Sequence, residues 1–271
     1  MAIIPQFYKD AVVAIGIRST RTKIAWIATG FVVARKNESG GYNTFLVTNK
    51  HVFEKDDGTV PNESLVLRFN LKNSIDAKDY DVTIVSDDGK KKYSVHKNKK
   101  TDIAAMILNP NILMHDLGDL SAFPLETVAL SRQEMIDNEV VEGALVYMLG
   151  FPSGIVGLNS KAPLCRLGCI SKITEPSPDG DFLIDIQNFP GSSGSPVINK
   201  IELTHLTDTK VYNKTSLIGI VSAYLPYQDT LVSSQTGRPM QIVNENSGLA
   251  IVFDVDSIRQ TVEMEFLRNR K

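Results

Sequence analysis

The chain has 271 residues, with 29 Lys and Arg against 31 Asp and Glu, which gives a formal net charge of −2. A near-neutral charge argues against a general nucleic-acid binder, which would be basic. Apolar residues make up 42% and charged residues 22%, as in ordinary globular proteins, and this composition excludes wholesale disorder. No apolar run approaches the roughly 20 residues that a membrane helix needs, so we expect no membrane partner.

Two cysteines, Cys165 and Cys169, fall in one segment that has the pattern of a strand. Four strand residues span about 13 Å, whereas the Cα atoms of a disulfide lie within about 7 Å of each other, so we expect no disulfide. Further ligands at zinc spacing are missing, and we expect no metal and no cofactor. The first residues lack a basic segment followed by an apolar one, so no secretory signal is expected. Together these features predict a cytoplasmic protein.

Short β-rich runs, separated by Gly and Asp turns, dominate the chain. About six runs, a connector over roughly 109–138 with helical spacing near 125–132, and about six more runs predict two similar all-β halves. In chain order we expect strands at Ala11–Ile17, Lys23–Ala34, Tyr42–Thr48, Ser64–Asn70, Asp81–Ser86, Asp102–Leu108, Gly143–Leu149, Leu164–Thr174, Asp181–Gln187, Pro196–Ile198, Val211–Ala223 and Gln241–Phe253.

The C-terminal segment has the spacing of an amphipathic helix of about 15 residues, and either Asp254 or Asp256 can cap its start. We expect this helix to pack on the β-structure. Its apolar positions are Val255, Ile258, Val262 and Phe266.

The segment NFPGSSGSPV, residues 188–197, places Ser193 between glycines on a tight turn, as expected of an exposed nucleophile. The N–H groups of Gly191 and Ser193 can then face a developing oxyanion. A serine needs an oriented base, and His51 at a strand end and Asp102 before a buried strand are the candidates for base and orienting acid. The order His, Asp, Ser over two β halves is more specific than any of the three alone. In a catalytic triad of this kind, His51 takes the proton of Ser193, and Asp102 fixes the tautomer of the His51 imidazole.

Seven segments in order resemble those of trypsin-like serine proteases of the chymotrypsin fold, nearest the Deg/HtrA-type peptidases. The likeness runs from about residue 11 to 255, and its motifs include TNKHVF, KTDIAAMIL, LGFPSG, NFPGSSGSPV and LIGIVSAY. The resemblance implies an all-β protein: two six-stranded antiparallel β-barrels of the chymotrypsin fold with a C-terminal α-helix. It implies an N-terminal barrel (1–125) with His51 and Asp102, a C-terminal barrel (126–253) with Ser193 and the substrate pocket, and a helix at 254–271.

Three features depart from the family pattern. Ser195 stands where the family has a second glycine and is expected to crowd the turn. Ser192 replaces the acid that pairs with a freed N-terminus in digestive enzymes, so we expect no such activation step. Unlike in most members of the family, we expect no PDZ domain after the helix, and this leaves the mode of regulation open.

In this fold the strand after the nucleophile pairs with an extended substrate. The hydroxyl of Ser222 can also donate to Asp102. Because the position six residues before the nucleophile is Gln187 and not an acid, we expect no preference for Lys or Arg. With Tyr224 at the mouth of the pocket, we expect cleavage after small or medium apolar residues. The residues that we expect to bind substrate are Gln187, Pro190, Ser222, Ala223 and Tyr224.

These patterns predict a serine endopeptidase that acts on a protein or peptide substrate through an acyl-enzyme. The alternatives are a catalytically silent binding module of the same fold and an esterase. Whether an activating partner is needed stays open. So does homo-oligomer formation, for which Ile3, Ile4, Phe7 and Tyr8 are candidates if they do not pack on the barrel.

Overall fold

The computed structural model describes residues 4–20, 22–71, 76–109, 111, 113, 120–157, 161–174, 181–202 and 209–270. Its elements in the first part are α1 (Gln6–Asp10), β1 (Val12–Arg18), β2 (Ile24–Lys36), β3 (Tyr42–Thr48), α2 (Lys50–Phe53), β4 (Ser64–Asn70), β5 (Ala77–Thr83), β6 (Ser94–Val95), β7 (Ala104–Ile107) and β8 (Phe123–Pro124). The second part holds α4 (Arg132–Asp137), β9 (Leu145–Gly150), the 3₁₀ turn η1 (Pro152–Gly154), β10 (Leu164–Lys172), β11 (Asp181–Asp185), β12 (Pro196–Asn199), β13 (Leu217–Val232), β14 (Pro239–Asp254) and α5 (Val255–Arg268).

The two halves are both built from antiparallel strands, and the fold is chymotrypsin-like. The second half is a closed six-stranded barrel in the order β10-β11-β14-β13-β12-β9, as expected. The first half is an eight-stranded sheet in the order β5-β4-β1-β2-β3-β7-β6, and the short β8 pairs with β2 in parallel. The sheet has more strands than expected because the two-residue strands β6 and β8 are too short to leave a sequence pattern.

Apolar side chains that alternate along the strands form the hydrophobic cores of the two halves. Inward-facing Val, Ile, Leu and Phe of the first sheet bury one cluster around Phe53 and Leu67, and the closed barrel buries another around Met148 and Val197. A third cluster joins the halves: Phe31 and Phe45 of the first pack with Leu149 of the second. This shared core holds the two halves in a fixed relation, on which the placement of the candidate residues His51, Asp102 and Ser193 depends.

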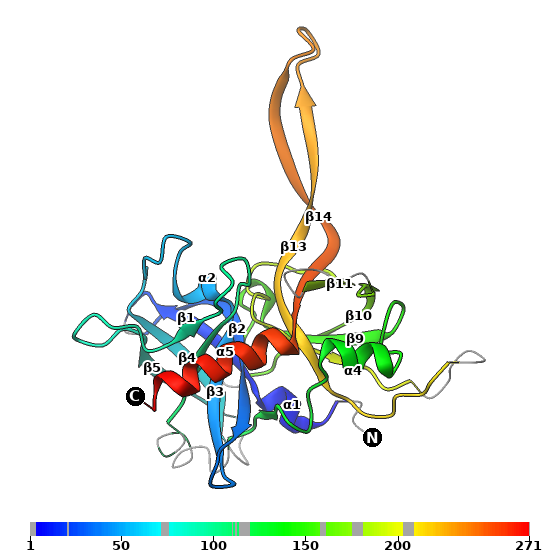
Figure 1. Cartoon of the computed structure of the whole chain (residues 1–271). Coiled ribbons are helices and arrows are strands. Elements are labelled where there is room, and N and C mark those ends of the chain that lie inside the picture. Colours follow the sequence, from blue (N-terminus) through cyan, green and yellow to red (C-terminus); the bar gives the residue numbers. More distant parts are fainter. Residues whose placement is uncertain are drawn as a thin grey trace.

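The C-terminal helix α5 begins where Asp254, not Asp256, accepts a hydrogen bond from the N–H of Ser257. Its apolar face is buried: Val255, Ile258 and Val262 are fully inaccessible to solvent. The helix crosses both halves, contacting β7 and β6 of the first and β13 and β14 of the second (Figure 1). The prediction of a packed amphipathic helix is therefore confirmed. No helix in the described part of the chain is long and apolar enough to cross a membrane.

At the N-terminus, Tyr8 is buried and its hydroxyl donates to the Thr215 carbonyl at 2.6 Å. Ile4 packs against the shared core, whereas Phe7 stays 40% exposed and Ile3 lies outside the described residues. Two of these four residues, Ile4 and Tyr8, are therefore used in packing on the body of the protein. The thiols of both cysteines are free, on β10.

Three element predictions were wrong in their position. The strand expected at Asp81–Ser86 lies earlier, as β5 over Ala77–Thr83. The connector helix is α4, later than the expected 125–132, because Ser131 and Glu134 form a capping box that starts it there. The strand expected from Val211 begins at Leu217 instead and continues far beyond Ala223. With β14 it forms a long two-stranded hairpin, whose inner part belongs to the closed barrel and whose outer part projects from the body of the protein (Figure 1).

Candidate active site

His51 and Asp102 lie at the same end of the β3–β7 pair in the first sheet, where Thr48 is opposite Ala104. His51 lies in the single turn α2 that follows β3, and Asp102 precedes β7, which pairs with β3. The Nδ1 atom of His51 is 2.6 Å from Oδ2 of Asp102, and the backbone N–H of His51 donates to Oδ1 at 3.0 Å. The Asp102 carboxylate therefore holds His51 by both its ring and its backbone N–H. The other ring nitrogen, Nε2, is left to accept a proton.

The second half supplies a further contact to this pair. The hydroxyl of Ser222, on β13, donates to Oδ2 of Asp102 at 2.8 Å, as the sequence predicted. The Asn49 amide also donates to the backbone carbonyl of Asp102 at 2.8 Å. Asp102 is thus oriented from both halves of the fold.

The charge of Asp102 acts on His51. Burial opposes protonation of the imidazole, but the hydrogen bond and the charge of Asp102 outweigh it, so the pKa of His51 is raised above its usual value. The side chain is half exposed to solvent. A histidine in this state is a competent general base above its pKa.

Ser193 lies between β11 and β12, in the loop expected to carry the nucleophile. Its hydroxyl donates to the carbonyl of Ser222 at 3.2 Å. Ser222 links it to the His51–Asp102 pair, because the Ser222 hydroxyl donates to Asp102, which is hydrogen-bonded to His51. Its backbone is fixed, because its carbonyl accepts the N–H of Thr29 at 2.9 Å.

The turn before Ser193 has a defined peptide orientation. The N–H of Ser192 donates to the carbonyl of Phe189 at 2.9 Å, and Gly191 has φ +94°, which together make a type II turn with Pro190 and Gly191 at its centre. The carbonyl of Pro190 accepts the N–H of Ser153, in η1, at 2.6 Å. Because C=O and N–H point in opposite directions across a trans peptide, the N–H of Gly191 points away from η1.

Both expected oxyanion donors are free in the described part of the chain: no hydrogen bond there uses the N–H of Gly191 or Ser193. A side chain at position 191 has no room, since a Cβ would lie 2.5 Å from the carbonyl oxygen of Phe151. The positive φ is a second reason for glycine there. The geometry is that of two unpaired N–H groups on a rigid turn, which can stabilise a negative oxygen.

Sequence reasoning missed Thr29 of β2 as a member of the site. It is fully buried, and its hydroxyl donates to the carbonyl of Gly191 at 2.8 Å while accepting the N–H of Phe151 at 3.0 Å. One threonine of the first half thus holds both the turn at 190–191 and the segment that leads into η1. A Thr in a strand carries no signal for this role in a single sequence.

Ser195 does not crowd the turn. Its side chain is buried against Gly150, where a Cβ would come within 2.0 Å of the Ser195 Oγ atom. The missing side chain at position 150 therefore makes room for the extra hydroxyl. That hydroxyl and the Ser192 hydroxyl are both buried without a hydrogen-bond partner among the described residues.

The expected substrate-binding residues occupy two adjoining segments. Ser222, Ala223 and Tyr224 lie on β13, and Tyr224 pairs with Ala250 of β14. Gln187 and Pro190 lie in the loop before the nucleophile, and both are exposed.

The buried polar residue of that loop is instead Asn188, 3% exposed, whose carbonyl accepts the amide N–H of Asn246 at 2.6 Å. Asn246 stands at the root of the β13–β14 hairpin and was not expected in the site. The loop before the nucleophile is therefore attached to the hairpin.

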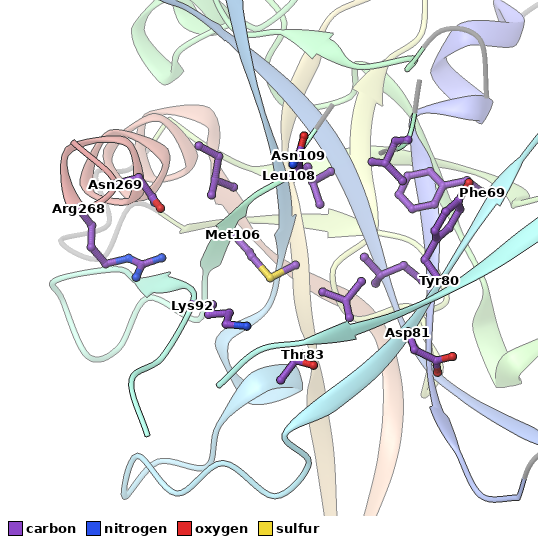
Figure 2. A pocket seen from close by; sticks show the side chains of 14 residues that line it. Phe69, Tyr80, Asp81, Thr83, Lys92, Met106, Leu108, Asn109, Arg268 and Asn269 are labelled. Carbon is purple, nitrogen blue, oxygen red and sulfur yellow. The ribbon is translucent and has the colours of Figure 1, made fainter. Parts of the chain in front are cut away.

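A cavity of about 480 Å³ lies elsewhere, in the first half (Figure 2). Phe69, Tyr80 and Met106 line it, with Arg268 and Asn269 from the end of α5. None of its described lining residues belongs to the group around Ser193, so this cavity is separate from the candidate active site. The described residues also contain no cluster of His, Cys, Asp and Glu that could hold a metal ion.

Comparison with known proteins agrees with the fold. Residues 28–202 match the model of the trypsin-like peptidase domain, and the chain therefore belongs to that family. The crystal structure of the MamO protease domain from Magnetospirillum magneticum, in its apo form, matches with a TM-score of 0.50 at 14% identity, over 93% of this chain and 96% of that chain. Identity this low bears on the fold alone. No curated protein matches the sequence significantly.

Proposed function

We propose that this protein is a serine endopeptidase. The observation that carries the proposal is the joint geometry of His51 with Asp102 at 2.6 Å and a type II turn whose Gly191 and Ser193 N–H groups are unpaired in the described part of the chain. A base with an orienting acid and an oxyanion site beside one serine are the parts that acyl transfer needs. Membership of the trypsin-like peptidase family supports the same class of reaction.

In the proposed reaction His51 Nε2 removes the proton from Ser193 Oγ as that oxygen attacks the scissile carbonyl carbon. The tetrahedral oxyanion accepts hydrogen bonds from the N–H groups of Gly191 and Ser193. His51 then gives its proton to the leaving amine, which leaves an ester on Ser193. A water molecule, deprotonated by His51, hydrolyses that ester and restores the free hydroxyl.

For specificity we propose small or medium apolar residues before the scissile bond. Position 187 carries an uncharged Gln, and Asn188 beside it is buried and neutral, so no carboxylate at these two positions can pair with Lys or Arg. Peptides that differ only in this residue (Ala, Val, Leu, Phe, Lys or Arg) test the proposal, with Ser193→Ala as the blank. The highest kcat/KM is expected for Ala, Val or Leu; a preference for Arg contradicts it.

A second candidate is a binding module without catalysis. The specific observation in its favour is that the Ser193 hydroxyl donates to the Ser222 carbonyl and not to His51. The same peptide panel separates the two: a silent module binds peptides but releases no product above the Ser193→Ala blank.

A further inference from the structure

The β13–β14 hairpin projects from the barrel beside the nucleophile. We call residues 226–246 the arm; its strands pair from Pro226 with Asn246 to Val232 with Pro239. Large apolar side chains on it are exposed: Tyr227 by 55%, Met240 by 74% and Ile242 by 60%. An isolated two-stranded hairpin is at best marginally stable in water, so this surface favours a third strand.

The outer edge of β13 changes its partner at a defined residue. β12 pairs with this edge as far as Ile220, and Val221 exchanges backbone hydrogen bonds with Gly194 and Ser195. From Ser222 to Val232, β14 is the one strand that pairs with β13 in the described part of the chain. The edge is therefore uncovered, among the described residues, from the nucleophile to the tip of the arm.

This edge begins at the place where substrate is proposed to bind. The carbonyl of Ser222 faces the nucleophile, since Ser193 Oγ lies 3.2 Å from it. A substrate that pairs antiparallel with β13 there runs with the residues preceding its scissile bond toward Tyr224 and the arm. From Pro226 to Val232 the strand continues for about 20 Å at about 3.3 Å per residue.

The root of the arm is tied to the active-site loop. The amide of Asn246 donates to the carbonyl of Asn188 at 2.6 Å, and the hydroxyl of Ser247 donates to the carbonyl of Leu225 at 2.5 Å. Asn188 is buried just before the type II turn. The arm consequently starts in a fixed position relative to Ser193, so a strand that passes the nucleophile meets the arm in register.

We infer that the free edge of β13 along the arm binds, as an added antiparallel strand, the substrate residues that lie four or more positions before the scissile bond. This inference rests on the proposed function and extends it: the substrate class is a long, extended polypeptide segment rather than a short peptide. Pro226 has no N–H, so at that position its carbonyl alone can hold the added strand. Exposed Tyr227 and Leu231 offer apolar contacts to β-branched substrate side chains.

Three fluorescent peptides with one common core from three residues before to four after the scissile bond test the inference. One is the core alone, one adds seven alternating Thr and Val residues at its N-terminus, and one adds a same-length segment with Pro at every second position. Dissociation constants are measured by anisotropy on Ser193→Ala, and kcat/KM on the protein with Ser193 intact. The arm is removed by joining Tyr227 to Glu245, which face each other, through Asn-Gly. A half-length arm joins Thr230 to Ile242 in the same way.

We expect the Thr-Val extension to lower the dissociation constant and to raise kcat/KM, each by at least about tenfold. This factor corresponds to about 1.4 kcal/mol, the contribution of one net hydrogen bond. The Pro extension is expected to have no such effect. Removing the arm abolishes the gain, the half-length arm keeps part of it, and kcat/KM for the core peptide stays within about twofold in both, since the remaining contacts of Ser193 are unchanged.

Equal affinity of the core and the Thr-Val peptide overturns the inference, and so does a gain that survives removal of the arm. If the arm instead binds a second copy of the chain, sedimentation shows a dimer that dissociates when the arm is removed. In that case the Thr-Val peptide keeps its advantage over the core peptide without the arm, and this result also overturns the inference. Failure of the proposed function is distinct: no peptide is then cleaved, while anisotropy on Ser193→Ala still decides whether the arm binds the extension.

Discussion

The carbonyl oxygen of Pro190 accepts a hydrogen bond from the backbone N–H of Ser153 at 2.6 Å, and this contact sets the direction of the next peptide N–H. Ser153 has φ +55° in a 3₁₀ turn that follows β9. The turn that carries the nucleophile is thus held by a second loop of the same barrel, and Thr29 of the other half holds its far side. Contacts from both halves therefore fix the backbone on which the reaction depends.

Replacing Gly191 by Ala is expected to lower kcat/KM by at least about a hundredfold, the usual effect of losing one oxyanion donor. A Cβ there would lie 2.5 Å from the carbonyl of Phe151, at a φ of +94°, so the peptide must move. Gly89→Ala is the matched control: Gly89 also has positive φ (+78°), but a Cβ there meets nothing within 4 Å. Equal activity of the two variants would show that the turn at 191 does not act on the reaction.

Thr29→Val removes one hydroxyl and keeps the shape of the side chain. It leaves the Gly191 carbonyl and the Phe151 N–H without their partner, so kcat is expected to fall about tenfold to a hundredfold with a smaller change in KM. The matched control is Thr44→Val on β3, whose buried hydroxyl has no hydrogen-bond partner to lose among the described residues. We expect Thr44→Val to retain wild-type kcat and stability. If Thr29→Val and Thr44→Val change kcat by the same factor, Thr29 is not a positioning residue.

The raised pKa of His51 predicts the acid side of the pH profile. The base works when neutral, so kcat/KM falls as the pH drops through a value above that of an ordinary histidine. In Asp102→Asn the hydrogen bond and charge that raise this pKa are lost, and the acid limb moves to lower pH. The maximal rate is expected to drop by about 10⁴-fold, the loss that this substitution causes in the triad of chymotrypsin-type proteases. An acid limb that stays in place in Asp102→Asn contradicts the assignment of the base.

Lys161 is a buried lysine outside the active site, and burial lowers its pKa to about 7. Its ammonium donates to the backbone carbonyls of Asp10 and Val12, joining the segment after α1 to the second half of the chain. Lys161→Met leaves these carbonyls without a donor and is expected to reduce the free energy of unfolding by about 1–3 kcal/mol per carbonyl. Urea unfolding measures this, with the exposed Lys97→Met as control. A midpoint equal to that of the control would contradict the structural role.

The sequence supported the β-class, the C-terminal helix and the three residues His51, Asp102 and Ser193, because each stands in a local pattern: a strand end, a strand start and a Gly-rich turn. The contacts of Thr29 could not be predicted, since they join residues far apart in the chain, such as Thr29 and Gly191. The first strand of the arm was missed for another reason, although most of its partner was expected as the strand Gln241–Phe253. Beyond Ala223, β13 is largely exposed on both faces, so it lacks the alternation of apolar and polar residues that burial imposes.

The most direct test of the central claim is the intact mass of the protein after reaction with a fluorophosphonate probe, for the natural chain and for Ser193→Ala. Such a probe needs an activated serine and an oxyanion site, and it needs no knowledge of the substrate. We predict one adduct on the natural chain and none on Ser193→Ala. No adduct on the natural chain, or equal labelling of the variant, would contradict the assignment of Ser193 as an activated nucleophile.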